Sequence, residues 1–173
     1  STRLAPKAPG YPIAVSIDFA GNDAYYKPTY YFPAEGGAFA GIGGLLDLSG
    51  NDTYTCDDEC LGSAISGVAL ARDYSGNDSY VGGSISLGDA ELQGIGILRD
   101  DAGHDSYLTT GGGGVVDSPG DLGLLWSRAG TDSYRARSGT ELALGSGIRW
   151  GAGWLVDEGL DIDRDLYKDG LTR

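Results

Sequence analysis

One stretch of the sequence reads Asp73-Tyr74-Ser75-Gly76-Asn77-Asp78-Ser79-Tyr80, and it recurs at a regular interval. Its general form is Asp-x-x-Gly-Asn-Asp-x-Tyr. The other copies, of which the last is degenerate, are 18–25, 47–54, 100–107, 127–134 and 156–163. The motif glycines follow one another at spacings of 29, 26, 27, 27 and 29 residues. A period this constant predicts a repeat protein in which equivalent units stack on one another.

The residues that flank each copy indicate short β-strands. Three and five positions before the first Asp stand apolar residues or Gly, such as Leu70 and Val68, or Ile97 and Ile95. This alternation predicts a strand whose apolar side is buried. After the Tyr, a Gly-rich segment begins a third extended piece; these segments are 36–41, 61–67, 87–94 and 142–147. Each unit is therefore predicted to contain a strand, an Asp-Gly-Asn turn, a strand, a loop and a strand.

Units of this size and content fit the coils of a parallel β-helix, or β-solenoid. We predict an all-β chain, a single parallel β-helix of about six coils with about 27 residues per coil and in-register strands about 4.8 Å apart. Ile, Val, Leu and Ala would fill the core, and the glycines would serve sharp corners that need φ > 0. The second choice, a β-propeller, has blades of about 40–45 residues or more. The repeats span 17–159, with an N-terminal tail or cap at 1–16 and a C-terminal cap or tail at 160–173.

The composition agrees with an all-β chain and limits the partners. Of 173 residues, 31 are Gly, and Asp outnumbers Glu by 20 to 5. This excludes a mainly helical fold, because Asp competes with the hydrogen bonds of a helix. The net charge of −13 argues against nucleic acid and anionic lipid as partners and favours cations. No apolar run approaches 18 residues, so we expect no membrane insertion.

Stacked coils bring the motif carboxylates into two ladders. The first Asp ladder is Asp18, Asp47, Asp73 and Asp100, and the second Asp ladder is Asp23, Asp52, Asp78, Asp105, Asp132 and Asp161. Two carboxylates about 5 Å apart repel by about 0.8 kcal/mol in water and about 3 kcal/mol at an effective dielectric constant of 20. Several such steps in a row need solvent, protons, hydrogen-bond donors or a bound cation.

A bound calcium ion is the first of two interpretations of these ladders. Calcium takes six to eight oxygen ligands from carboxylates, amide oxygens and backbone carbonyls, and the motif offers all three. The candidate ligands are Asp18, Asn22, Asp23, Asp47, Asn51, Asp52, Asp73, Asn77, Asp78, Asp100, Asp105 and Asp132. The first three copies are expected to bind best, since later copies replace the Asn by His104 or Thr131 and the first Asp by Ser127.

The segment Gly-Asn-Asp-x-Tyr resembles the Gly-x-Asp-x-apolar core of the calcium-binding nonapeptide of repeats-in-toxin proteins. In that family such turns bind calcium between the coils of a parallel β-roll, which folds on secretion. The resemblance covers about five residues in each unit. The nine-residue period and the leading Gly-Gly-x of the family are missing here. The resemblance implies a similar turn rather than membership.

Turn capping is the second interpretation. Asp and Asn side chains accept hydrogen bonds from backbone N–H groups in their own turns. On this interpretation the first Asp of the motif accepts the backbone N–H of the Gly-Asn peptide, and the second Asp faces open solvent. Another cation is a third choice.

The aromatic residues form a further repeated feature. The motif tyrosines are Tyr25, Tyr54, Tyr80, Tyr107 and Tyr134. We expect their rings to pack between coils with the hydroxyls in water; a stripe that binds a glycan or a partner surface is the alternative. Trp126, Trp150 and Trp154 are expected to fill a wider C-terminal core, with an interface as the alternative for Trp150 and Trp154.

The cysteines and the absence of Met bear on the compartment. Cys56 and Cys60 are the only cysteines, and we favour a small disulfide in an oxidising compartment over half of a metal site. Because the chain contains no Met, Ser1 is not a translation start, and a processed N-terminus is expected. We therefore expect an extracellular or cell-surface protein.

The sequence contains no recognisable catalytic constellation. His104 is the sole histidine, and the serines have no accompanying base. We expect a non-catalytic structural or adhesive β-solenoid, stabilised by calcium, that could join end to end into a filament or other extracellular assembly. The alternative is a carbohydrate-binding or polysaccharide-lyase-like β-helix. Arg72 and Arg99 each precede a first Asp, but two basic residues do not make a groove, and the acidic chain would repel polyuronates.

Overall fold

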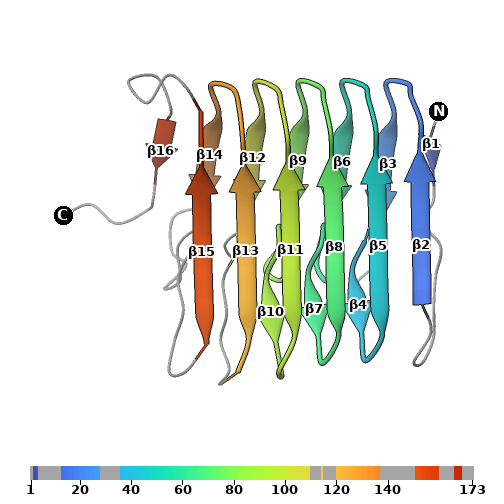
Figure 1. Ribbon diagram of the computed structural model, residues 1–173, viewed down its shortest axis with the longest axis vertical. Helices are drawn as coiled ribbons and strands as arrows, with labels where there is room; N and C mark the ends of the chain where they lie inside the picture. Colours follow the sequence, from blue (N-terminus) through green and yellow to red (C-terminus); the bar gives the residue numbers. More distant parts are fainter. Residues whose placement is uncertain are drawn as a thin grey trace.

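The computed structural model is a parallel β-solenoid (Figure 1). It describes residues 2–3, 13–27, 36–109, 114, 120–136, 151–159 and 166–168. The regular structure of these residues consists of strands in three parallel sheets, so the all-β fold is confirmed. In this part of the chain there is no helix with the length and hydropathy needed to span a membrane.

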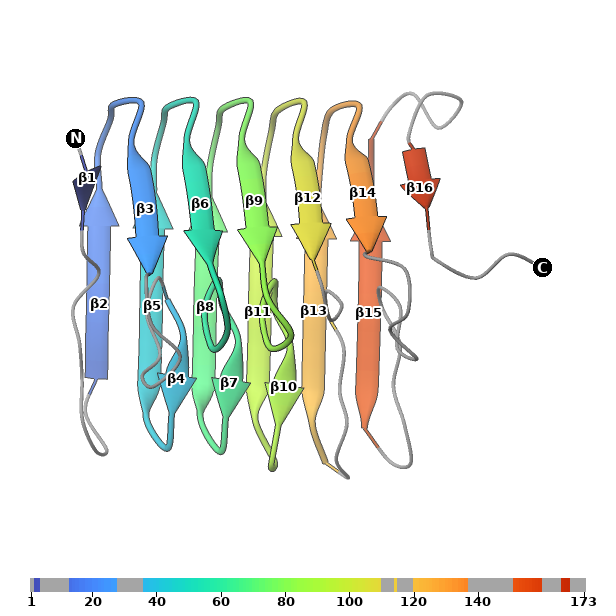
Figure 2. The ribbon, with the colours of Figure 1, turned by 180° about the vertical axis from the view of Figure 1, so that it is seen from behind.

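Two large sheets face each other, and a small one lies beside them (Figures 1 and 2). The front sheet, nearest the viewer in Figure 1, contains β2 (Ile13–Asp18), β5 (Ile42–Asp47), β8 (Val68–Asp73), β11 (Ile95–Asp100), β13 (Leu122–Ser127) and β15 (Ala152–Asp157). The back sheet contains β1 (Thr2–Arg3), β3 (Ala24–Lys27), β6 (Thr53–Cys56), β9 (Ser79–Gly82), β12 (Ser106–Thr109), β14 (Ser133–Ala136) and β16 (Leu166–Lys168). The side sheet contains β4 (Ala38–Phe39), β7 (Ala64–Ile65) and β10 (Ala90–Glu91).

Each strand pairs in parallel with its equivalent one repeat away. β8 pairs with β11 so that Asp73 lies beside Asp100, and β6 pairs with β9 so that Tyr54 lies beside Tyr80. The motif turn connects the front sheet to the back sheet, and the chain then passes through the side sheet. The predicted order of strand, turn, strand, loop and strand is confirmed for the units at 42–65 and 68–91. The predicted extended piece at 142–147 lies outside the described residues.

The described residues complete about four turns of about 27 residues, fewer than the six coils predicted. The first and last repeats add β2 and β15 to the front sheet, whereas the described side-sheet strands lie only between residues 38 and 91. At the two ends, β1 pairs with β3 and β16 pairs with β14. Short pieces of the 1–16 and 160–173 segments thus extend the back sheet.

The side of the front sheet that faces inward is opposite to the predicted one. In β5 the residues Gly43, Leu45 and Asp47 are buried, and the predicted core residue Ile42 is exposed. The first inward position, beside the side sheet, accepts only a small residue: a Cβ on Gly43 would lie 2.1 Å from the carbonyl oxygen of Gly37, and buried Ala69 holds the equivalent place in β8. Large apolar side chains of this sheet therefore lie on its outer surface, among them Ile13, Ile42, Val68 and Ile95.

The interior between the two large sheets combines leucines with the motif tyrosines. The rings of neighbouring motif tyrosines stack with centroids 4.7 to 4.9 Å apart, which confirms that they pack between coils. Cys56 and Cys60 form a disulfide inside the same cluster. The prediction that the tryptophans fill the core is wrong for Trp126, which lies on the outward side of β13, and for Trp154, which is about half exposed on β15. Trp150 lies outside the described residues.

The motif glycine is required by the close approach of successive coils. A Cβ on Gly76 would lie 2.0 Å from the carbonyl oxygen of Gly50, and one on Gly103 would lie 1.9 Å from that of Gly76. The predicted positive φ is confirmed at Gly36, Gly62 and Gly88 of the Gly-rich segments. Among the motif glycines of the described residues it occurs only at Gly21 and Gly130. At the other copies, the contact between coils rather than the backbone conformation excludes a side chain.

Candidate metal centre

The first Asp ladder points into the solenoid because of strand alternation. Each first Asp ends a front-sheet strand and follows an inward position by two residues, as Asp47 follows Leu45 and Asp100 follows Leu98. The ladder carboxyls Asp18, Asp47, Asp73 and Asp100 are 0 to 3% exposed. Ser127 holds the equivalent place in β13 and is also buried.

The second Asp ladder is buried for a similar reason. Each second Asp stands two residues before an inward-facing Tyr of the back sheet, as Asp52 stands before Tyr54. Its described members Asp23, Asp52, Asp78, Asp105 and Asp132 are 1 to 7% exposed. The interpretation in which the second Asp faces open solvent is therefore wrong. Asp161 lies outside the described residues.

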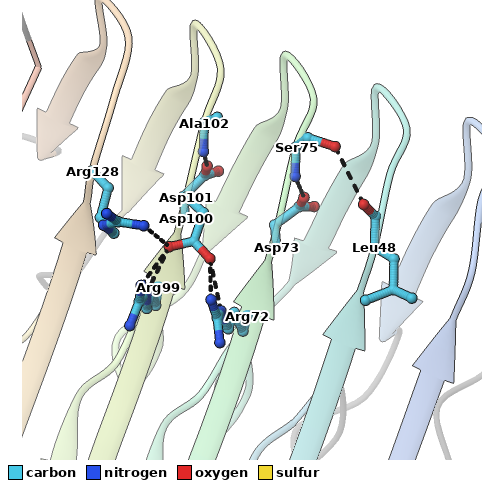
Figure 3. A network of polar contacts seen from close by, with 9 residues as sticks. All are labelled: Leu48, Arg72, Asp73, Ser75, Arg99, Asp100, Asp101, Ala102 and Arg128. Carbon is cyan, nitrogen blue, oxygen red and sulfur yellow. Dashed lines mark hydrogen bonds and ion pairs between the residues drawn. The ribbon is translucent and has the colours of Figure 1, made fainter.

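One oxygen of each first-ladder carboxyl caps the motif turn. The backbone N–H of Ser75 donates a hydrogen bond to Asp73 Oδ1 at 3.0 Å, and that of Ala102 donates to Asp100 Oδ1 at 3.1 Å (Figure 3). The same bond joins Ser49 to Asp47 at 3.3 Å. The predicted capping role of the first Asp is thus present at these copies, two residues after the carboxyl rather than at the Gly-Asn peptide.

One carboxyl oxygen of Asp52, Asp78, Asp105 and Asp132 links two coils. The backbone N–H of Asp52 donates to Oδ1 of Asp78 at 2.6 Å, and the N–H of Asp78 donates to Oδ1 of Asp105 at 2.8 Å. The bond from Asp105 to Asp132 continues the series at 2.8 Å. The other oxygens of Asp52, Asp78 and Asp105 are buried and accept no hydrogen bond in the structure.

The motif tyrosines donate to the first Asp ladder, a role that the sequence analysis missed. The hydroxyl of Tyr54 donates to Asp73 Oδ2 at 2.7 Å, and that of Tyr80 donates to Asp100 Oδ2 at 2.7 Å. Their rings are buried, so the predicted wet hydroxyls are wrong. The hydroxyl of Tyr107 is also buried but has no hydrogen-bond partner.

The asparagines are placed on the outside of the turn. Asn22, Asn51 and Asn77 are exposed, and each accepts the backbone N–H of the equivalent residue in the next coil, at 2.8 to 2.9 Å. Their amide oxygens therefore serve the exterior of the turn, and the structure does not bring them to the carboxylates inside.

Two groups of three carboxylates come together between the ladders. One group is Asp47, Asp52 and Asp73, and the other is Asp78, Asp100 and Asp105. Within each group the three ligand oxygens lie within 4.8 Å of one another. Two oxygens bound to one calcium ion at 2.3–2.6 Å are separated by at most about 5 Å, so each group has the spacing to hold a cation. Asp18, Asp23 and Asp132 are buried in the same ladders without belonging to either group.

The electrostatics of the two groups favour uptake of a positive charge. Burial is the main cause that raises the pKa of Asp73 to about 7, and repulsion from Asp100 adds to it, against the hydrogen bond from Tyr54. Burial likewise dominates the rise in pKa to about 6 for Asp52 and Asp100, about 8 for Asp78 and about 9 for Asp105. Near neutral pH Asp78 and Asp105 therefore hold protons, which a cation can replace.

A comparison of this chain with protein-family models, curated proteins and solved structures finds no match. The candidate site therefore rests on the geometry of the chain itself: two buried Asp ladders, a tyrosine ladder that donates to one of them, and two carboxylate groups with unpaired oxygens.

Proposed function

We propose that this protein is a non-catalytic structural β-solenoid that binds calcium between its two Asp ladders. The observation that carries the proposal is the pair of buried carboxylate groups, Asp47–Asp52–Asp73 and Asp78–Asp100–Asp105. In each group at least one carboxylate oxygen is buried without a hydrogen-bond partner. An unpaired buried oxygen costs about 1–3 kcal/mol, and more when it is charged, and a bound cation removes that cost.

The chemistry of the donors favours calcium over other common metals. Both groups offer only carboxylate oxygens. Zinc and copper prefer His and Cys, and the two cysteines are consumed by their disulfide. Magnesium demands an octahedral shell and usually keeps several waters, whereas calcium accepts irregular sets of oxygens.

Burial of the site argues for a structural rather than a catalytic role. The six carboxylates of the two groups are 0 to 3% exposed, and a substrate cannot contact groups enclosed between two sheets. A cation there would join neighbouring coils, since each group draws carboxylates from two successive repeats. Its effect would be to stiffen the stack.

The disulfide supports an extracellular or cell-surface location. Disulfides persist in oxidising compartments and are rare in the cytosol of mesophiles. Calcium is also most abundant outside cells, so weak sites there would be filled. End-to-end assembly belongs to the same proposal, because the parallel coils add one strand per repeat and another copy could continue the series.

The deciding experiment measures bound metal and thermal stability together. The chain is dialysed against a chelator, then against calcium or magnesium at equal ionic strength, and metal is counted by mass spectrometry after removal of free ions. We expect calcium to be retained and the melting temperature to rise by about 5–10 °C at a hundredfold excess over the dissociation constant. Equal melting temperatures in calcium and in chelator, together with no retained metal, would contradict the proposal. Light scattering in the same samples tests assembly.

A further inference from the structure

The outer face of the front sheet carries the most concentrated positive charge among the described residues. Arg72 on β8, Arg99 on β11 and Arg128 just after β13 converge on the single carboxylate of Asp101 (Figure 3). We call these four residues the arginine cluster. A guanidinium is charged at all physiological pH values, so the cluster carries an excess of positive charge in a chain whose net charge is −13.

The guanidinium groups are held in fixed positions by Asp101 and by aromatic rings. Arg72 Nε donates to Asp101 Oδ2 at 2.8 Å, and Arg99 Nε and Nη2 both lie 2.7 Å from Oδ1. The Arg72 guanidinium lies 3.8 Å from the ring centroid of Tyr74, and that of Arg99 lies 4.4 Å from Trp126. Such stacking fixes the planes of the two guanidinium groups.

Asp101 uses only part of the donor capacity of the cluster. Each guanidinium has five N–H donors, and the bonds to Asp101 take two from Arg72, two from Arg99 and one from Arg128. The arginine side chains remain 23 to 44% exposed, while Asp101 is 8% exposed. Burial acts to raise the pKa of Asp101, but the hydrogen bonds from the three arginines outweigh it, so its pKa lies below the ordinary value. Because the arginine side chains are partly exposed, a second carboxylate can approach the N–H donors that Asp101 does not use.

The surface beside the cluster is apolar. On the outer face the arginines adjoin a row formed by Leu70, Ile97 and Leu124, followed by a row formed by Val68, Ile95 and Leu122. Val68 and Ile95 are exposed, as is Trp154 on β15. The six strands span about 24 Å at about 4.8 Å per step. An apolar surface of this extent beside a charged cluster is typical of a protein-binding face.

We propose that this face binds an acidic polypeptide segment of a partner, in which carboxylate side chains alternate with apolar ones. The carboxylates would bind the arginine cluster, and the apolar side chains would cover the neighbouring rows. The charge complementarity selects an acidic partner, and the apolar rows select a polypeptide over a polysaccharide, whose hydroxyls would lose water against Leu70 and Ile97. A second copy does not supply the complementary charge through this face, since the outward positions of its described front-sheet strands carry apolar residues and arginines but no carboxylates.

The test uses a defined peptide. An extended peptide of about eight residues crosses the six strands, so the probe is a capped, fluorescently labelled octapeptide of alternating Leu and Glu. Fluorescence anisotropy measures its binding. The comparison peptides replace Glu by Lys, or Leu by Ser. We expect the Leu–Glu peptide to bind, the Lys peptide not to bind, and the Ser–Glu peptide to bind at least tenfold more weakly.

Variants assign the binding to the cluster. The double variant Arg72→Gln/Arg99→Gln should weaken binding of the Leu–Glu peptide at least tenfold. Arg128→Gln alone should weaken it at least threefold. Arg135→Gln is the matched control, since Arg135 is exposed on β14 of the back sheet and should leave binding unchanged. Arg128→Gln leaves Arg72 and Arg99 bound to Asp101, so it tests the role of the cluster if the double variant does not fold. The proposal is overturned by absence of binding, by equal binding to the wild type and Arg128→Gln, by tighter binding of polygalacturonate than of the peptide, or by dimerisation through this face.

Discussion

The hydroxyl of Tyr80 in one coil donates a hydrogen bond to Asp100 in the next coil, at 2.7 Å from Oδ2. The equivalent bond joins Tyr54 to Asp73. Because the ring of each tyrosine also stacks on its neighbours, the same side chain supplies apolar packing and satisfies a buried carboxylate. The polar and apolar parts of the core are therefore interdependent.

Removal of one tyrosine hydroxyl should lower the stability of the folded chain. Tyr80→Phe keeps the ring but leaves Asp100 Oδ2 without its donor. We expect a loss of about 1–3 kcal/mol in the free energy of unfolding, measured by urea denaturation in the presence of chelator. Tyr26→Phe is the matched control on the back sheet, because Tyr26 is 52% exposed. An equal effect of the two substitutions would contradict the role assigned to the Tyr80 hydroxyl.

Stability without metal should fall as the pH rises. The pKa values of Asp73, Asp78 and Asp105 are raised by burial to about 7, 8 and 9, above the ordinary value of 3.8. Between that value and the raised ones the folded chain binds more protons than the unfolded chain, so the free energy of unfolding decreases with pH. In chelator, we expect the melting temperature at pH 9 to be at least about 5 °C below that at pH 5.

Calcium should oppose this pH dependence. Cations compete with protons for the same carboxylates and bind best when these are ionised. The melting temperature in excess calcium should therefore differ from that in chelator most at pH 9 and least at pH 5. A stabilisation by calcium that is the same at both pH values would place the ion elsewhere than in these carboxylate groups.

Neutralising one member of a carboxylate group should reduce calcium uptake. Asp78→Asn removes one charge from the group that also contains Asp100 and Asp105. We expect fewer calcium ions per chain by mass spectrometry and a smaller rise in melting temperature with calcium. Asp57→Asn, at an exposed position in the loop after β6, is the control and should bind calcium as the wild type does. Equal loss in both variants would point to a general charge effect.

The parallel stacking of the coils could be predicted because the residues that recur with this period contact their equivalents in the neighbouring coil. Gly76 lies against Gly50 and Gly103 against Gly76, so the glycine cannot be lost from the described turns without a clash. The strand order followed from the same period. The inward side could not be predicted from apolar alternation, since both sides of β11 carry large apolar residues, Leu98 inside and Ile95 outside.

The inward side of the front sheet also depends on its packing against the side sheet, where only small residues fit. A side chain at Gly96 would lie 2.0 Å from the carbonyl oxygen of Asp89, at the edge of the side sheet. The two Asp ladders were predicted, but their burial was missed as a consequence. Asp47 stands two residues after Leu45, and Asp52 two residues before Tyr54, so a choice of Leu and Tyr as the core would have placed both carboxyls inside.

The close approach of coils at the motif glycine leads to the last prediction. In Gly76→Ala the new Cβ would lie 2.0 Å from the carbonyl oxygen of Gly50 and 2.6 Å from the carboxylate of Asp78. The two coils must separate to accommodate it, which weakens the hydrogen bond from Asp52 to Asp78 Oδ1. We expect a loss of about 2–4 kcal/mol in the free energy of unfolding, measured by urea denaturation. Ser106→Ala, at an exposed position of β12, should change it by less than about 0.5 kcal/mol. If Gly76→Ala is as stable as the control, the coils tolerate a wider spacing than the interlocked turns of this structure imply.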